Sequence, residues 1–136
     1  MTLQEFLNKG KSVKGITKKI VIGDRFKDEN GKDFSFTIKA LSAEQLEQYR
    51  AKASSYDSNG NFKFESMLFN TKIAIAGCQY PNFKDAESIT ERGCRTPEEY
   101  IKDVLLPGEI EALGESIKRL SGYNISISEL IEESKN

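Results

Sequence analysis

The residues that could do chemistry are few, and their spacing completes no catalytic motif. Gly10-Lys11-Ser12 has the order that ends a phosphate-binding P-loop, but Glu5 stands where that loop needs a glycine. The sequence has no histidine, which excludes Ser-His-Asp triads, imidazole acid/base catalysis and histidine-containing zinc sites. Glu98-Glu99 and Glu132-Glu133 are each adjacent on a predicted helix, where neighbouring side chains diverge, so neither pair forms an acid/base dyad.

Two glycine-containing motifs resemble part of a calcium-binding loop. Asp28-Glu29-Asn30-Gly31 and Asp57-Ser58-Asn59-Gly60 place a glycine where an EF-hand loop has its sixth position. The bidentate glutamate of such a loop is replaced by Thr37 in the first case and by Ser66 in the second. We therefore interpret both motifs as turns, and expect no metal and no cofactor.

The two cysteines give no further site. Cys78 and Cys94 are 16 positions apart and have no additional soft ligands near them in the sequence. The first residues show no basic segment followed by an apolar one, so we expect no signal peptide, a cytoplasmic location and two reduced, structural thiols. With no catalytic residues identified, the sequence predicts a protein that is not an enzyme.

Composition points to a globular protein with uneven charge. The 136 residues are 38% hydrophobic and 30% charged, and no apolar run reaches the roughly 18 residues of a membrane span. The formal net charge is −1, but residues 1–39 carry nine basic and five acidic side chains, whereas residues 97–136 carry four and nine. Opposite charge at the two ends can guide a partner or a second copy into register.

The N-terminal part predicts a short helix and then a β-hairpin. Thr2 and Glu5 have capping-box spacing, and residues 1–15 are expected to form this helix and a flexible basic link. Residues 16–22 and 33–40 show strand patterning on either side of Asn30-Gly31, a dipeptide in which both residues accept positive φ. We expect an antiparallel hairpin over residues 16–40, with Phe26, Phe34 and Phe36 in the core.

Residues 41–136 are predicted to be helical. Ser42 with Gln45, Thr96-Pro97 and Ser126 with Glu129 are N-terminal helix signals, and Gly77 and Gly122 are candidate C-terminal caps. Residues 54–61 are expected to be a polar loop. The sequence therefore predicts an α+β fold in which residues 1–136 form one domain, an N-terminal antiparallel β-hairpin packed by four to six α-helices.

Candidate binding residues are apolar positions that a small domain has difficulty burying. Leu3, Phe6 and Leu7 form an apolar stripe on a helix too short to be stable alone, so this helix must dock on its own core, a second copy or a client. Leu130 and Ile131, in an acidic terminal segment, are the second candidates. An alternative reading has the basic N-terminal third and its phenylalanines bind single-stranded nucleic acid.

Several segments in sequence order also resemble a known family, the tail assembly chaperones of phages and of phage-like elements or prophages of Gram-positive bacteria. The segments that carry the resemblance are Leu3-Gln4-Glu5-Phe6-Leu7, Phe34-Ser35-Phe36 leading into Leu41-Ser42, Pro81-Asn82-Phe83, Leu105-Leu106-Pro107-Gly108-Glu109 with Leu113, and Leu120-Ser121-Gly122-Tyr123.

The resemblance implies a non-enzymatic chaperone in the bacterial host cytoplasm. It would bind the tape measure protein, a long helical chain, and keep it soluble until tail-tube subunits polymerise around it. It also implies a homo-oligomer, the tail tube protein as a second partner, and the short form of a protein that frameshifting can extend. The alternative function is a small nucleic-acid-binding regulator encoded on a mobile element.

Overall fold

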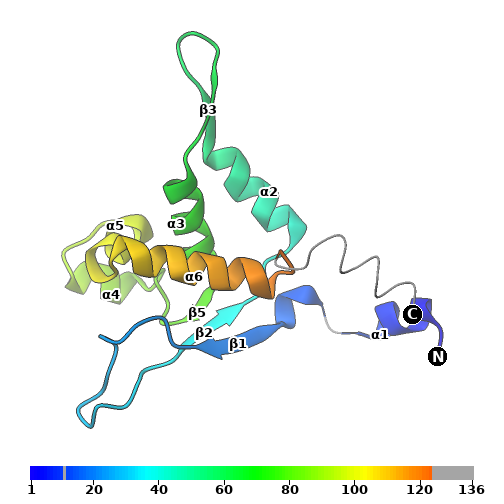
Figure 1. The fold of residues 1–136 in the computed structure, drawn as a ribbon, viewed down its shortest axis with the longest axis horizontal. Helices are drawn as coiled ribbons and strands as arrows, with labels where there is room; N and C mark the ends of the chain where they lie inside the picture. The colour runs from blue at the N-terminus through cyan, green and yellow to red at the C-terminus, as the bar shows by residue number, and fades with distance from the viewer. Residues whose placement is uncertain (11, 124–136) are drawn as a thin grey trace.

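The computed structural model describes residues 1–10 and 12–123, and their arrangement is drawn in Figure 1. Within these residues the elements are α1 (Leu3–Lys9), the 3-10 turn η1 (Val13–Gly15), β1 (Thr17–Ile20), β2 (Phe36–Lys39), α2 (Ala43–Lys52), β3 (Ser54–Tyr56), β4 (Phe62–Phe64), α3 (Ser66–Gly77), β5 (Cys78–Tyr80), α4 (Ala86–Glu91), α5 (Pro97–Val104) and α6 (Pro107–Leu120). This confirms the predicted α+β class with an N-terminal antiparallel hairpin. No helix in this part of the chain is long and apolar enough to cross a bilayer.

The predicted hairpin is present, although its strands are shorter than expected. β1 and β2 pair antiparallel from Thr17–Lys39 to Ile20–Phe36. Their connection turns at Gly31, whose φ of 79° is positive, while Asn30 keeps a negative φ. The predicted turn at Asn30-Gly31 is therefore present, and it uses positive φ at the glycine alone. The Asp28 carboxylate instead accepts the backbone N–H groups of Asn30 and Lys32, which holds a wider turn.

A second hairpin replaces the polar loop predicted for residues 54–61. β3 and β4 pair antiparallel from Ser54–Phe64 to Tyr56–Phe62 and project from the body at the junction of α2 and α3 (Figure 1). Asp57 accepts the N–H groups of Asn59 and Asn61, and Gly60 has a φ of 81°. The same Asp-x-Asn-Gly turn thus closes both hairpins. We call residues 54–64 the arm.

The region predicted to be wholly helical also supplies a strand to the main sheet. β5 follows α3 directly and pairs antiparallel with the free edge of β2, giving the order β1-β2-β5. Its local sequence, Cys78-Gln79-Tyr80, carries little strand signal. It becomes a strand because α3 delivers it to an unpaired edge whose backbone groups need partners.

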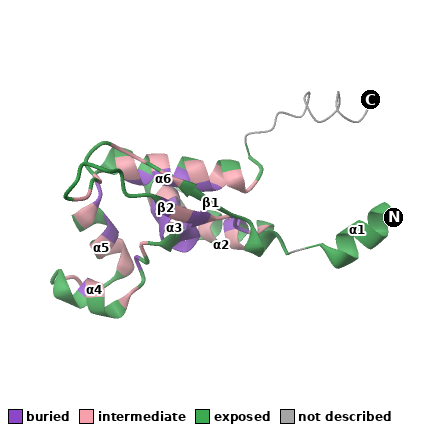
Figure 2. Cartoon of the chain, turned by 90° about the horizontal axis from the view of Figure 1, so that it is seen from below, coloured by how far each residue is buried: buried purple, intermediate pink, exposed green. Residues whose placement is uncertain are grey.

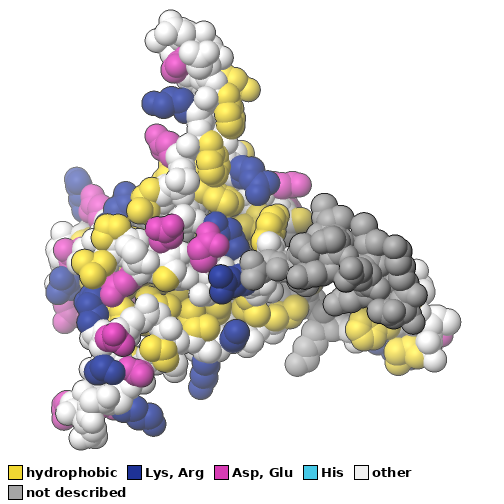
Figure 3. Space-filling view, in the orientation of Figure 1, with side chains coloured by type: hydrophobic (Ala, Val, Ile, Leu, Met, Phe, Trp, Pro, Cys, Tyr) yellow, Lys and Arg dark blue, Asp and Glu magenta, His cyan; other side chains and the backbone are white. Residues whose placement is uncertain are grey.

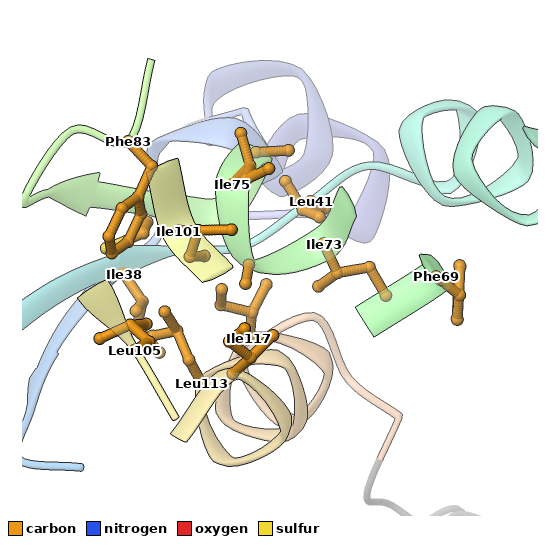
Figure 4. Close-up of a cluster of buried hydrophobic side chains, with 14 of the residues drawn as sticks. Ile38, Leu41, Phe69, Ile73, Ile75, Phe83, Ile101, Leu105, Leu113 and Ile117 are labelled. Atoms are coloured by element: carbon orange, nitrogen blue, oxygen red, sulfur yellow. The ribbon is translucent and has the colours of Figure 1, made fainter. Parts of the chain in front are cut away.

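Helix α3 lies at the centre of the core. Seven of its residues are buried, from Phe69 to Gly77, and α2, α5, α6 and the sheet surround it (Figure 4). Gly77 does not cap the helix as predicted but lies inside it, against α6. A Cβ added at Gly77 would be 2.5 Å from Cγ2 of Ile117, so glycine is needed there for close approach of two helices.

Most of the predicted helix ends are confirmed. The Ser42–Gln45 capping box opens α2, and the Thr96 hydroxyl accepts the N–H of Glu99 at the start of α5. Gly122, with a φ of 97°, ends α6 as expected. The helix predicted from Ser126 lies outside the described residues.

The Gly77 contact gives a test of the core. Gly77→Ala should lower the free energy of unfolding by about 1–3 kcal/mol, because the added methyl overlaps Ile117 and packed cores accommodate extra volume poorly. Urea unfolding monitored by circular dichroism measures this loss. Gly108→Ala is the matched control, since nothing lies within 4 Å of a Cβ added there; it should be neutral or stabilise by up to about 1 kcal/mol. Equal stability of the two variants would contradict the packing described.

Candidate functional site

Helix α1 presents an apolar surface that the other described residues, 10 and 12–123, do not cover. Thr2 caps it by accepting the N–H of Glu5, and none of its residues is buried. Leu3, Phe6 and Leu7 are 72%, 61% and 63% exposed. Figure 2 shows the helix at one end of the molecule, clear of the packed elements. The structure therefore brings these three predicted residues together, whereas Leu130 and Ile131 lie outside the described residues.

A second apolar surface, the aromatic groove, is a cavity of about 320 Å³ lined by the first hairpin, the segment after β5 and α5. Phe26 contacts Phe36 edge to face at 5.1 Å between ring centres, and the floor includes Phe83. Phe36 is buried as predicted and Phe26 is half-buried, but Phe34 is 55% exposed. The expectation that Phe34 belongs to the core is wrong, because the β1–β2 ladder ends at Phe36 and Phe34 lies beyond it.

One ion pair fixes the wall of this groove. Arg25 donates through Nε and Nη2 to both oxygens of Glu109, at 2.8 and 2.7 Å, and through Nη2 to the carbonyl of Val104. Its guanidinium also lies 4.6 Å from the ring centre of Phe26. The hydrogen bonds from Arg25 lower the pKa of the Glu109 carboxyl. These contacts tie the first hairpin to the end of α5, at Val104, and to the first turn of α6, at Glu109.

The arm carries a third apolar surface, and sequence reasoning missed it. Because side chains alternate along a strand and paired residues share a face, Tyr56, Phe62 and Phe64 lie on one side of the arm. They are 73%, 61% and 42% exposed, and Met67, in the first turn of α3, is also 42% exposed. Figure 3 shows hydrophobic side chains following the arm down to the body. The Phe62-Lys63-Phe64 alternation after an Asp-x-Asn-Gly turn was the available signal.

The groups tested for chemistry are engaged in structural contacts. Burial raises the pKa of the Cys78 thiol to about 12, so it stays protonated. Cys94 is half-buried, and both cysteines are free. Glu98 pairs with Lys72 at 2.8 Å and Glu99 with Arg95 at 3.1 Å. Residues 1–10 and 12–123 contain no cluster of three or more acidic, cysteine or histidine side chains arranged for a metal.

These features define a small α+β protein whose exposed surfaces are suited to binding other proteins. Residues 3–135 match the family described as phage XkdN-like tail assembly chaperone proteins. The chain therefore belongs to this family of tail assembly chaperones, and the predicted resemblance is confirmed.

Two curated relatives and one solved structure are similar to the chain. It is 28% identical to the uncharacterized protein YqbN of Bacillus subtilis strain 168, over 96% of this chain and 91% of the relative. It is 27% identical to the phage-like element PBSX protein XkdN of the same strain, over 96% and 92%. The crystal structure of YqbN superposes with a TM-score of 0.68 at 22% identity, covering 88% of this chain and 95% of that one, which shows the shared fold.

The Arg25–Glu109 pair predicts a specific dependence of stability on pH. Because the pKa of Glu109 is lower in the folded state, the stabilisation is complete above the usual glutamate pKa of about 4.3 and is lost as the pH falls through the folded value. Arg25→Met should therefore be less stable than wild type at pH 7, and the difference should shrink below about pH 4. Urea midpoints measured across this range test it.

Lys27→Met is the control for this prediction, because it removes an exposed pair with Asp33 from the same hairpin. Exposed pairs contribute little, so its urea midpoint should stay close to that of wild type. An Arg25→Met variant as stable as Lys27→Met at pH 7 would show that the pair does not hold the groove wall.

The failed motifs predict that no metal or nucleotide stabilises the protein. A ligand that binds only the folded state raises the melting temperature. Because we expect no site for calcium, zinc or ATP, adding any of them should change the melting temperature by less than about 1 °C. Differential scanning fluorimetry measures this directly. A rise of several degrees with any one of them would mean that a binding site exists.

Proposed function

We propose that this tail assembly chaperone binds the tape measure protein and keeps it soluble until tail-tube subunits surround it. The observation that carries the proposal is helix α1, which places Leu3, Phe6 and Leu7 in solvent at one end of the molecule. A long helical client that awaits its tube exposes apolar stripes, and an apolar helix is a fitting partner for them. No step of this function requires catalysis.

The physics of α1 suits reversible binding. A helix of seven residues is marginal in water, so docking on a client stabilises both partners. Apolar burial contributes roughly 25 cal/mol per Å², so three side chains give a modest affinity for each copy. Many copies along one client would raise the overall affinity through avidity. Each contact could still be broken as the tube grows.

The proposal includes self-association and a second partner. Residues 1–39 have a net positive charge and residues 97–136 a net negative one, so copies arranged head to tail would bring opposite charges together. Weak association of this kind would line up several chaperones on one client. Contact with the tail tube protein would then allow client transfer in the host cytoplasm.

A nucleic-acid-binding regulator is the alternative function. Its strongest support is Phe34, an exposed aromatic side chain near Lys27 and Lys32. Phe36, which this function would also need in solvent, is buried at 4% exposure. A salt-dependent mobility shift with single-stranded or duplex nucleic acid would favour this alternative.

The role of α1 can be tested by removing its apolar stripe. The triple variant Leu3→Ser/Phe6→Ser/Leu7→Ser should lose most of its ability to co-purify with a co-expressed tape measure protein, and most of the client should become insoluble. The reason is that the stripe supplies the apolar area buried against the client. The soluble fraction and the co-purified amount of the client are the measurements.

Gln4→Ser/Asn8→Ser is the matched control, because these two residues occupy another face of α1 and hydrogen-bond to each other at 3.2 Å. It should retain the client like wild type. The melting temperature of the triple variant should be unchanged, since none of the substituted side chains is buried. Full retention of the client by the folded triple variant would rule out α1 as the binding element.

A further inference from the structure

The aromatic face of the arm has no cover among the described residues. Tyr56 and Phe62 contact each other edge to face at 5.7 Å, and Phe64 contacts Phe69 of the core at 5.4 Å. The Tyr56, Phe62 and Phe64 rings thus follow one face of the arm from the outer end of its strands to the core, and we call them with Met67, in the first turn of α3, the strip. Contiguous exposed apolar strips of this kind mark docking surfaces.

Cationic side chains flank the base of this strip. The guanidinium of Arg50 lies 5.6 Å from the ring centre of Phe69, and Nζ of Lys118 lies 5.8 Å from it. Lys118 is paired with Glu115 at 2.7 Å, whereas no ion pair of Arg50 is found within the part of the chain that the structure describes. An occupant with apolar side chains flanked by carboxylates would complement this surface.

The terminal segment of the chain has this composition. Residues 124–136 contain Ile127, Leu130 and Ile131, which share one face at helical spacing. The segment also carries Glu129, Glu132 and Glu133 against a single Lys135, so its charge is opposite to that of Arg50 and Lys118.

The segment also begins within reach of the arm. Tyr123, the last described residue, donates its N–H to the carbonyl of Lys118, the residue whose ammonium lies beside Phe69. Leu130 is seven positions after Tyr123, enough to span about 10 Å as a helix and roughly 23 Å when extended. Phe64 lies one ring contact beyond Phe69, so apolar residues of the segment can reach the strip.

We propose that residues 124–136 dock on the aromatic face of their own arm, with Leu130 and Ile131 against Phe62, Phe64 and Met67. The glutamates of the segment then lie beside Arg50 and Lys118. This gives Leu130 and Ile131 an intramolecular partner in place of a client. It does not depend on which client the chaperone binds.

A peptide competition experiment tests the proposal with the full-length chain. The variant Leu130→Ser/Ile131→Ser vacates the strip, and a fluorescently labelled peptide of residues 124–136 is titrated onto it by anisotropy. We expect a Kd below about 1 mM, the order of the effective concentration of a tethered segment. Binding should weaken several-fold in the wild-type chain, whose own segment competes, and also at high salt because the charge contacts are screened.

Two phenylalanine substitutions in the vacated variant locate the binding surface. Phe62→Ser should weaken peptide binding about tenfold or more, because it removes an apolar contact from the strip. Phe34→Ser is the matched control: it makes the same substitution at a similarly exposed residue of the aromatic groove, 55% against 61%. It should change the Kd by less than about twofold.

Three results would overturn the proposal. Absence of binding at about 1 mM peptide means that the segment is too weak to dock even when tethered. An equal loss with Phe34→Ser places the segment elsewhere. The third result comes from hydrogen exchange of residues 54–64 in the wild-type chain. If exchange slows only when the protein concentration is raised, a second copy of the chain, and not the chain's own segment, covers the arm. If residues 54–64 exchange more slowly in the wild-type chain than in the vacated variant at every protein concentration, docking within one chain is supported.

Discussion

The fold depends on burying α3 on nearly every side. From Ile73 to Gly77 every residue of this helix is buried, so no single neighbour can cover it. The sheet, α2, α5 and α6 each take one side, and the α6 contact is the closest because Gly77 has no side chain opposite Ile117. The neighbours that cover α3 therefore come from both sides of it in the chain: the first hairpin and α2 precede it, and β5, α5 and α6 follow it.

Helix α1 and most of the arm lie outside the core that forms around α3. Among the described residues, the buried hydrophobic side chains lie between Phe36 and Ile117. Helix α1 therefore precedes the core in the chain, and the arm projects from it. Both carry large apolar side chains, such as Phe6 and Phe62, that stay exposed among the described residues. Apolar area that the described core does not bury is available for docking.

Sequence reasoning succeeded where local chemistry decides the structure. The caps at Ser42, Thr96 and Gly122 fixed the ends of α2, α5 and α6, and alternation with a turn glycine located the first hairpin. It failed where contacts distant in sequence decide the structure. β5 is a strand because it pairs with the free edge of β2, and Gly77 is required because Ile117 packs against it. Of the exposed apolar surfaces, α1 was predicted because its stripe is local. The arm was missed because strands of three residues give almost no periodic signal.

The two hairpins share the same local turn but differ in their tertiary contacts. Both close with an Asp-x-Asn-Gly turn in which the carboxylate accepts two backbone N–H groups. The first is held down by Arg25 on Glu109 and by Phe26 on Phe36, so it becomes a fixed wall of the aromatic groove. Among the described residues, the aromatic contact between the arm and the core lies at the base of the arm, between Phe64 and Phe69. A segment with few core contacts opens at low free-energy cost, so the arm can move relative to the core more easily than the fixed wall of the groove can.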